Sequence, residues 1–207
     1  MYALITDGSI SKFINHPKSL VIGDVQYPAK IFQLWSTSEL NAIGIYEVVF
    51  DDSNKKDEKW YINTNQSYDF DGNEVTASYG TATPKAHADS LYTSQDNTDG
   101  LIPDDKSVGD VKVEGLKTKL IRTLKQQVAG ILSNTDWYIT RNTEKSTAIP
   151  SSISTHRDAV RTKQTEMETA ITNASDTTAL ETLYTYTTDS DGITQPRPLG
   201  ELPRLES

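Results

Sequence analysis

The chain has 207 residues, enough for one large domain or two small ones, and its 29 acidic and 20 basic side chains give a net charge of −9. This acidity argues against nucleic acid and against an anionic membrane surface as partners, because both require clustered Lys and Arg. The absence of cysteine excludes disulfides and thiol chemistry. The first ten residues show no signal peptide, and no apolar run is as long as a membrane span.

Residues 1–80 are predicted to form a small β-rich domain with one short helix. β-prone runs separated by turn residues such as Asp-Gly predict strands at 2–6, 10–14, 20–22, 25–27, 45–50, 60–62, 66–70 and 75–79. Ser36 and Glu39 have the three-residue spacing of a capping box at a helix start. Gly44 stands where a left-handed cap is expected at the helix end.

The composition and the apolar periodicity divide the rest of the chain into three segments. Residues 81–112 are rich in Pro, Gly, Asp and Ser, which predicts a polar linker. In 113–186, apolar residues recur at helical spacing on both sides of Pro150, which predicts an α-helical hairpin. Residues 187–207 contain three prolines and predict an extended C-terminal arm. The predicted fold class is therefore α+β.

No residue pattern predicts catalysis, a cofactor or a metal. His16, His87 and His156 lack any metal-ligand spacing, and the chain contains no phosphate-binding glycine motif and no G-x-S-x-G. The stretches 69–74 and 189–192 begin like calcium loops but do not complete the pattern. Both are interpreted as turns, in which Asp and Asn accept hydrogen bonds from their own backbone.

The three tryptophans allow two interpretations. Trp35 and Trp137 fall at helix boundaries and are expected to be core anchors, with Trp137 pinning a polar loop between two helices. For Trp60, Tyr61 and Tyr68 a second interpretation stays open, in which exposed rings stack on host glycans.

Three patches carry a family resemblance. LSNTDWY at 132–138, AIP at 148–150 and HRDAVR at 156–161 resemble the C-terminal helical region of tailed-bacteriophage tail-fibre assembly and tail-associated proteins. In that family a pattern like L-L-x-x-T-D-W is followed by a short loop and Y-R-x-A-[LV]-R, and here His156 replaces the usual aromatic residue. Segments 35–46 and 197–201 are similar to phage tail proteins as well.

This resemblance implies a non-enzymatic virion tail protein, made in the host cytoplasm, that contacts other tail or fibre proteins; a homo-oligomer stays open. The alternatives are a tail-fibre assembly chaperone absent from the mature virion, and a receptor-binding module that uses the three glycan candidates. The residues expected to contact partners are Trp137, Tyr138, Arg197, Pro198, Leu199 and Leu205.

Overall fold

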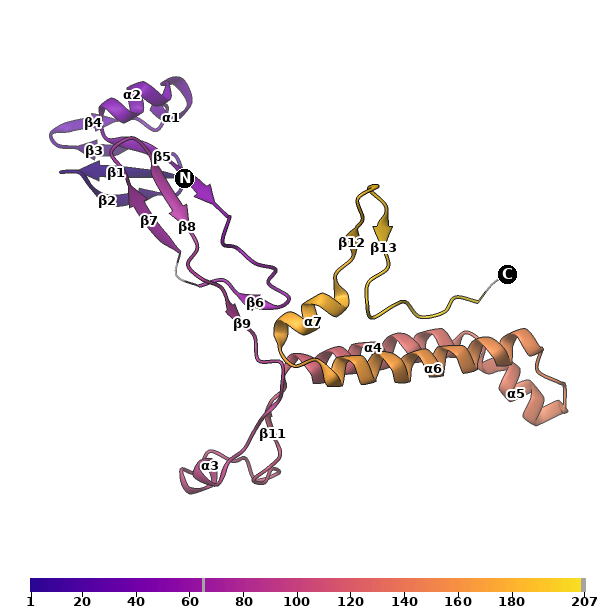
Figure 1. Ribbon diagram of the computed structural model, residues 1–207. Helices are drawn as coiled ribbons and strands as arrows, with labels where there is room; N and C mark the ends of the chain where they lie inside the picture. Colours follow the sequence, from indigo (N-terminus) through magenta and orange to yellow (C-terminus); the bar gives the residue numbers. More distant parts are fainter. Residues whose placement is uncertain (65, 206–207) are drawn as a thin grey trace. The chain divides into compact units, whose positions relative to one another are not determined.

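The computed structural model describes residues 1–64 and 66–205, and the chain divides into two compact units, Met1–Thr83 and Pro84–Ser207. We call them the β unit and the helical unit (Figure 1). The α+β class is confirmed. The division falls after Thr83, whereas we expected the first domain to end at residue 80. Among the described residues, no helix combines the length and apolar character needed to cross a membrane.

The β unit is built on a five-stranded sheet in the order β2-β1-β5-β8-β7. Its strands are β1 (Tyr2–Thr6), β2 (Ser9–Ile14), β5 (Ile45–Asp51), β7 (Ser67–Phe70) and β8 (Val75–Ser78). β5 and β8 are parallel, and the other three pairs are antiparallel. Two smaller pairs are β3 (Leu20–Ile22) with β4 (Val25–Tyr27) and β6 (Tyr61–Ile62) with β9 (Thr83–Pro84).

Apolar side chains lie on both faces of this sheet. Successive residues of a strand point to opposite faces, so β1 and β5 each contribute to the clusters on both faces. On one face, α1 (Ile31–Leu34) and α2 (Thr37–Ala42) cover a cluster formed by Ile14, Ile31, Phe32, Leu40 and Ile45. The other face carries Ala3, Val48, Val75 and Ala77. The edge strands β2 and β7 approach each other, with the ring centroids of Phe13 and Tyr68 4.4 Å apart. The sheet is therefore curled.

Local signals in this unit are confirmed. Asp7 and Gly8 form the first hairpin turn with φ of 52° and 74°. The Ser36 side chain accepts the Glu39 N–H, and Glu39 accepts the Ser36 N–H, which completes the capping box. Gly44 has φ of 81°, and a Cβ there would lie 2.7 Å from the carbonyl oxygen of Ile5. Both its conformation and its surroundings thus require glycine.

The helical unit contains α4 (Leu116–Ser133) and α6 (Ser151–Asn173), which pack side by side and antiparallel (Figure 1). The two predicted stripes form their interface, and α7 (Thr177–Tyr184) closes one end. The buried residues include Leu124, Val128, Val160, Met167, Ile171 and Leu180. The helical interpretation of both stripes is confirmed.

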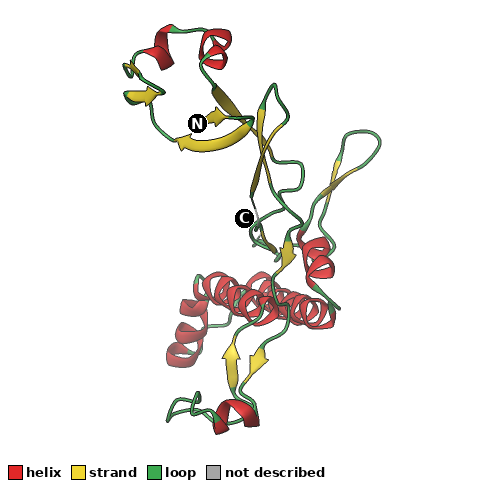
Figure 2. Cartoon of the chain, turned by 90° about the vertical axis from the view of Figure 1, so that its left-hand side faces the viewer, coloured by secondary structure: helices red, strands yellow, loops and turns green. Residues whose placement is uncertain are grey.

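The expected linker is instead a folded arm. β10 (Ser90–Leu91) and β11 (Val111–Val113) form an antiparallel pair that leads away from the helices to α3 (Ser94–Thr98), as Figure 2 shows. Asp96 caps α3 together with Thr93 and lies 2.5 Å from the Lys112 ammonium. Asp89 accepts the N–H of Gly115 at 2.6 Å and so fixes the arm to the start of α4.

The C-terminal segment, which we expected to be extended, is irregular apart from one short hairpin. Residues after α7 form a short hairpin of β12 (Thr187–Thr188) and β13 (Thr194–Gln195). The chain then returns to its own helices: the Leu199 N–H donates to the Leu183 carbonyl at 3.0 Å, and the Leu199 side chain is 3% exposed. The buried leucine and this backbone hydrogen bond are among the contacts that hold the segment against the unit, and the Arg197 guanidinium over the Tyr184 ring of α7 is another.

Candidate interaction surface

A buried arginine fixes the junction between α4 and α5 (Asp136–Lys145). Arg157, on α6, donates from Nη1 to the Leu132 carbonyl at 2.7 Å and to Thr135 Oγ1 at 2.6 Å. Its Nη2 lies 2.8 Å from the Asp136 carboxylate. Carbonyls in the last turn of a helix lack intrahelical partners, and a cation there also interacts favourably with the helix dipole. Arg157 therefore sets where α4 ends and how α5 begins.

The segment expected to be a polar loop is helix α5, and none of its side chains is buried. The prediction that Trp137 is a core anchor is wrong, since its side chain is 51% exposed. The ring centroids of Trp137 and Tyr138 are 3.7 Å apart. The Arg141 guanidinium carbon lies 4.8 Å from the first ring centroid and 5.6 Å from the second. We call these three residues the α5 patch.

The Arg141 guanidinium has no acceptor among the residues that the structure describes. Its Nε is buried without a hydrogen-bond partner, and no carboxylate of the described chain forms an ion pair with it. A buried N–H without an acceptor costs about 1–3 kcal/mol. Stacking on the two rings offsets part of this cost, because a cation–π contact at an exposed site contributes about 0.5–1 kcal/mol.

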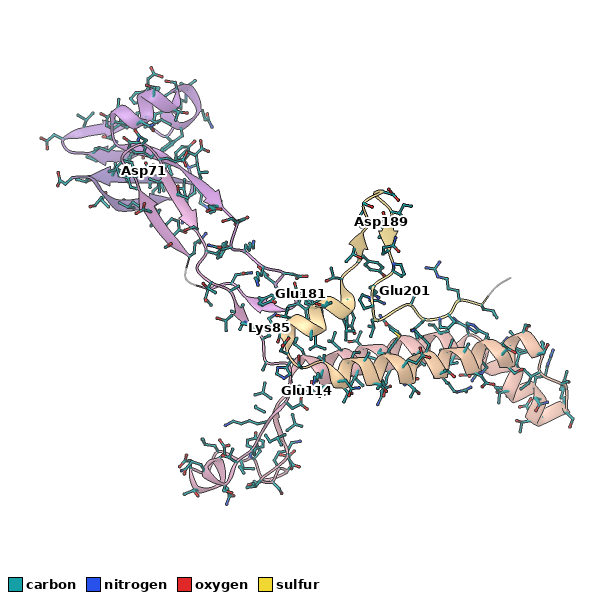
Figure 3. All side chains as sticks on the ribbon, viewed as in Figure 1. Asp71, Lys85, Glu114, Glu181, Asp189 and Glu201 are labelled. Atoms are coloured by element: carbon teal, nitrogen blue, oxygen red, sulfur yellow. The ribbon has the colours of Figure 1, made fainter. Side chains whose placement is uncertain are left out.

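Arg197, expected to contact a partner, instead stabilises the folded tail. Its Nε donates to the Gly200 carbonyl at 3.1 Å and lies 2.8 Å from the carboxylate of Glu201, which Figure 3 labels. Tyr186 donates its hydroxyl to the same carboxylate. This hydrogen bond and the Arg197 charge hold the pKa of Glu201 below its ordinary value. The guanidinium is thus already paired.

The other tail residues divide into one buried and two exposed. Leu199 is buried in the unit and so cannot meet a partner, while Pro198 is exposed and Leu205 is 43% exposed. Leu205 lines a hollow of about 410 Å³ beside α4 and α6, together with Ile131 and His156. A second hollow of about 850 Å³ lies between Gln127, Ile131 and Met167 of the helices and Arg197, Leu202 and Arg204 of the tail.

Two of the three residues for which glycan stacking stayed open are buried. Trp60 and Tyr61 are each 3% exposed. The Lys59 and Lys56 ammonium nitrogens lie over their rings, both at 4.5 Å from the centroid, where a sugar would stack. Tyr68 is half-buried against Phe13. Trp35 packs edge-on against Tyr27 at 5.8 Å beside the α1–α2 core cluster, in agreement with its predicted role as an anchor.

The two Asp-Gly stretches are turns, as expected. Asp71 accepts the N–H groups of Asn73 and Glu74, both at 2.8 Å, and Asp189 accepts those of Asp191 and Ile193. These hydrogen bonds lower the pKa of both carboxyl groups. Within 1–64 and 66–205, no group of three or more acidic or histidine side chains is placed to hold a metal ion.

Two residues of this surface escaped prediction. Arg157 is four residues after Ile153 and three before Val160, so it has the helical spacing of the apolar stripe of α6. We did not assign it to that stripe because charged residues are rarely buried. Arg141 is four residues after Trp137 and therefore shares a helical face with it. The sequence indicates this contact only once residues 136–145 are known to be a helix. Comparison with known proteins gives no relative: no family model, curated protein or solved structure matches the chain.

Proposed function

We propose that this chain is a non-enzymatic tail protein of a tailed bacteriophage, attached to tail fibres or baseplate through contacts of the α5 patch. The observation that carries the proposal is how the two halves of the family-like pattern meet. Leu132, Thr135 and Asp136 of the first half all bind Arg157 of the second half. Residues of both halves therefore form the Arg157 contacts, which we call the Arg157 clamp. These contacts fix the start of α5, the helix on which Trp137 is half exposed.

The composition of the patch supports a protein partner. Trp, Tyr and Arg are the residues most enriched where protein–protein binding energy concentrates, and the patch consists of one of each. An aromatic side chain that is half exposed on a surface helix retains most of its apolar area for burial by a partner. The partners on this proposal are other tail or fibre proteins, and the location is the virion tail.

The glycan-binding alternative loses its support, because Trp60 and Tyr61 are buried under lysine side chains. A chaperone would use the same surface as a structural tail protein, and the two functions differ in whether the chain is present in the mature particle. A chaperone leaves the fibre before the particle is complete, whereas a structural tail protein remains in it.

Mass spectrometry of purified virions tests the proposal. We expect the chain in particles at a fixed ratio to the other tail proteins, and we expect Trp137→Ala to lower that ratio strongly. Ile193→Ala is the matched control, since Ile193 is 60% exposed in the same unit but lies on the β12–β13 hairpin. Absence of the wild-type chain from particles would overturn the proposal, and failure of fibres to assemble without the chain would then favour the chaperone.

A further inference from the structure

We infer that the α5 patch binds an acidic segment of a partner protein, with a carboxylate on Arg141 and an apolar side chain on Trp137. This inference rests on the proposed function and names the chemistry of its partner. Its starting point is the half-buried Arg141 guanidinium, which lies over two rings and has no hydrogen-bond acceptor among the described residues.

The geometry suits a carboxylate. A guanidinium that stacks on aromatic rings keeps its N–H donors in its own plane, and that plane matches the two oxygens of a carboxylate. The rings also restrict the arginine side chain, so less conformational entropy is lost when the ion pair forms. Trp137, one helical turn before Arg141, offers an apolar surface within reach of the neighbouring residue of the same segment.

The local charge points in the same direction. Residues 136–161 carry four cationic and three anionic side chains, in a chain whose net charge is −9. Two ion pairs, Asp136 with Arg157 at 2.8 Å and Asp158 with Arg161 at 3.4 Å, use two anions and two cations. Arg141 and Lys145 then remain against Glu144, a net charge of +1. The patch is therefore locally cationic and favours an anion. A nucleic-acid backbone is a poorer fit, because it requires several clustered cations.

The test uses the full chain labelled with ¹⁵N and two capped probe peptides, Leu-Glu-Leu-Glu-Leu and its counterpart with Gln in place of Glu. NMR follows the Trp137 indole and the Arg141 Nε–H signals. We expect the Glu peptide to shift both signals and to bind about tenfold more tightly than the Gln peptide. Arg141→Gln is expected to remove this preference, while Lys18→Gln, which neutralises an exposed cation of the β unit, is expected to keep it.

Three results would overturn the inference: equal affinity for the two peptides, a preference that survives in Arg141→Gln, or no shift up to about 10 mM peptide. These three results concern peptide binding, whereas the proposed function is tested by the presence of the chain in virions, so the two can fail separately. A chain that is present in the particle but shows no preference for Glu would overturn this inference alone.

Discussion

The β unit and the helical unit use their aromatic residues in opposite ways. In the β unit the rings pair with one another around the sheet, as in Tyr2 with Phe32 at 4.9 Å and Tyr46 with Phe70 at 4.7 Å. In the helical unit the core is mainly aliphatic, and Trp137 lies on a helix that has no fully buried side chain. Aromatic burial thus stabilises the first unit, whereas the second keeps its tryptophan at the surface, where it can contact another protein.

The largest expected effect comes from truncating a ring in each unit. Phe32→Ala should lower the free energy of unfolding of the β unit by about 3–5 kcal/mol, because Phe32 lies in a packed cluster. Trp137→Ala should lower that of the helical unit by only about 1–2 kcal/mol, because half of the side chain is already exposed to solvent. Urea unfolding measured by circular dichroism compares the two. Similar losses of unfolding free energy for both variants would contradict the proposed difference between buried rings in the β unit and an exposed ring in the helical unit.

The Arg157 clamp should be the polar feature with the largest effect. Arg157→Met is expected to destabilise the helical unit by about 1–3 kcal/mol, since Thr135 Oγ1 loses its donor. The Leu132 carbonyl loses one of its donors and keeps those of Thr135. Arg161→Met is the matched control: its ion pair with Asp158 is exposed and should contribute less than about 0.5 kcal/mol. Thermal melts of the three proteins measure this difference, and equal shifts for both variants would argue against the clamp.

Close packing in the β unit gives an effect of similar size. Gly44→Ala should cost more than about 2 kcal/mol, because the new Cβ would meet the Ile5 carbonyl and because φ is positive. Gly8→Ala, which also has positive φ but has open space around it, should cost only about 1 kcal/mol. Unfolding midpoints of the two variants separate the clash from the backbone strain. A cost at Gly8 as large as at Gly44 would refute the clash.

The α3 arm should respond to acid. The hydrogen bond from Lys112, assisted by the Thr93 N–H, lowers the pKa of Asp96 to about 2 from its ordinary 3.8. A lowered native pKa stabilises the fold above the unfolded value and is lost as pH falls through the native one. Amide protection in residues 90–113 should therefore decline between about pH 4 and pH 2. Asp96→Asn should abolish this pH dependence; an unchanged profile would contradict it.

Elements with an apolar period or a distinctive turn were predictable from the sequence. Asp7-Gly8 and Gly23-Asp24 marked two hairpins, and the stripes of α4 and α6 marked the long helices. Helix α5 was missed because it is short, is rich in polar residues and has no fully buried side chain. The α3 arm was missed because polar contacts, such as Asp96 with Lys112, stabilise it in place of an apolar run.

The candidate surface was predictable in part. The family-like pattern pointed to Trp137 and Tyr138, but we expected Trp137 to be a buried anchor at a helix boundary, whereas it lies half exposed on helix α5. The Arg157 clamp joins residues more than twenty positions apart, and local sequence does not reveal such a contact. The return of the tail depends on a few contacts, such as the buried Leu199 and the Arg197 guanidinium over Tyr184, in a segment whose prolines indicate extended structure.

The most direct test of the central claim, that the α5 patch is a contact surface, is photo-crosslinking in assembled particles. A benzophenone amino acid replaces Trp137 in one variant and Ile193 in another, since both positions are at least half exposed in the helical unit. After irradiation of purified virions, we expect position 137 to crosslink to a different tail or fibre protein and position 193 to give little product. Crosslinks from position 137 to its own chain alone, or equal yields from both positions, would contradict the account.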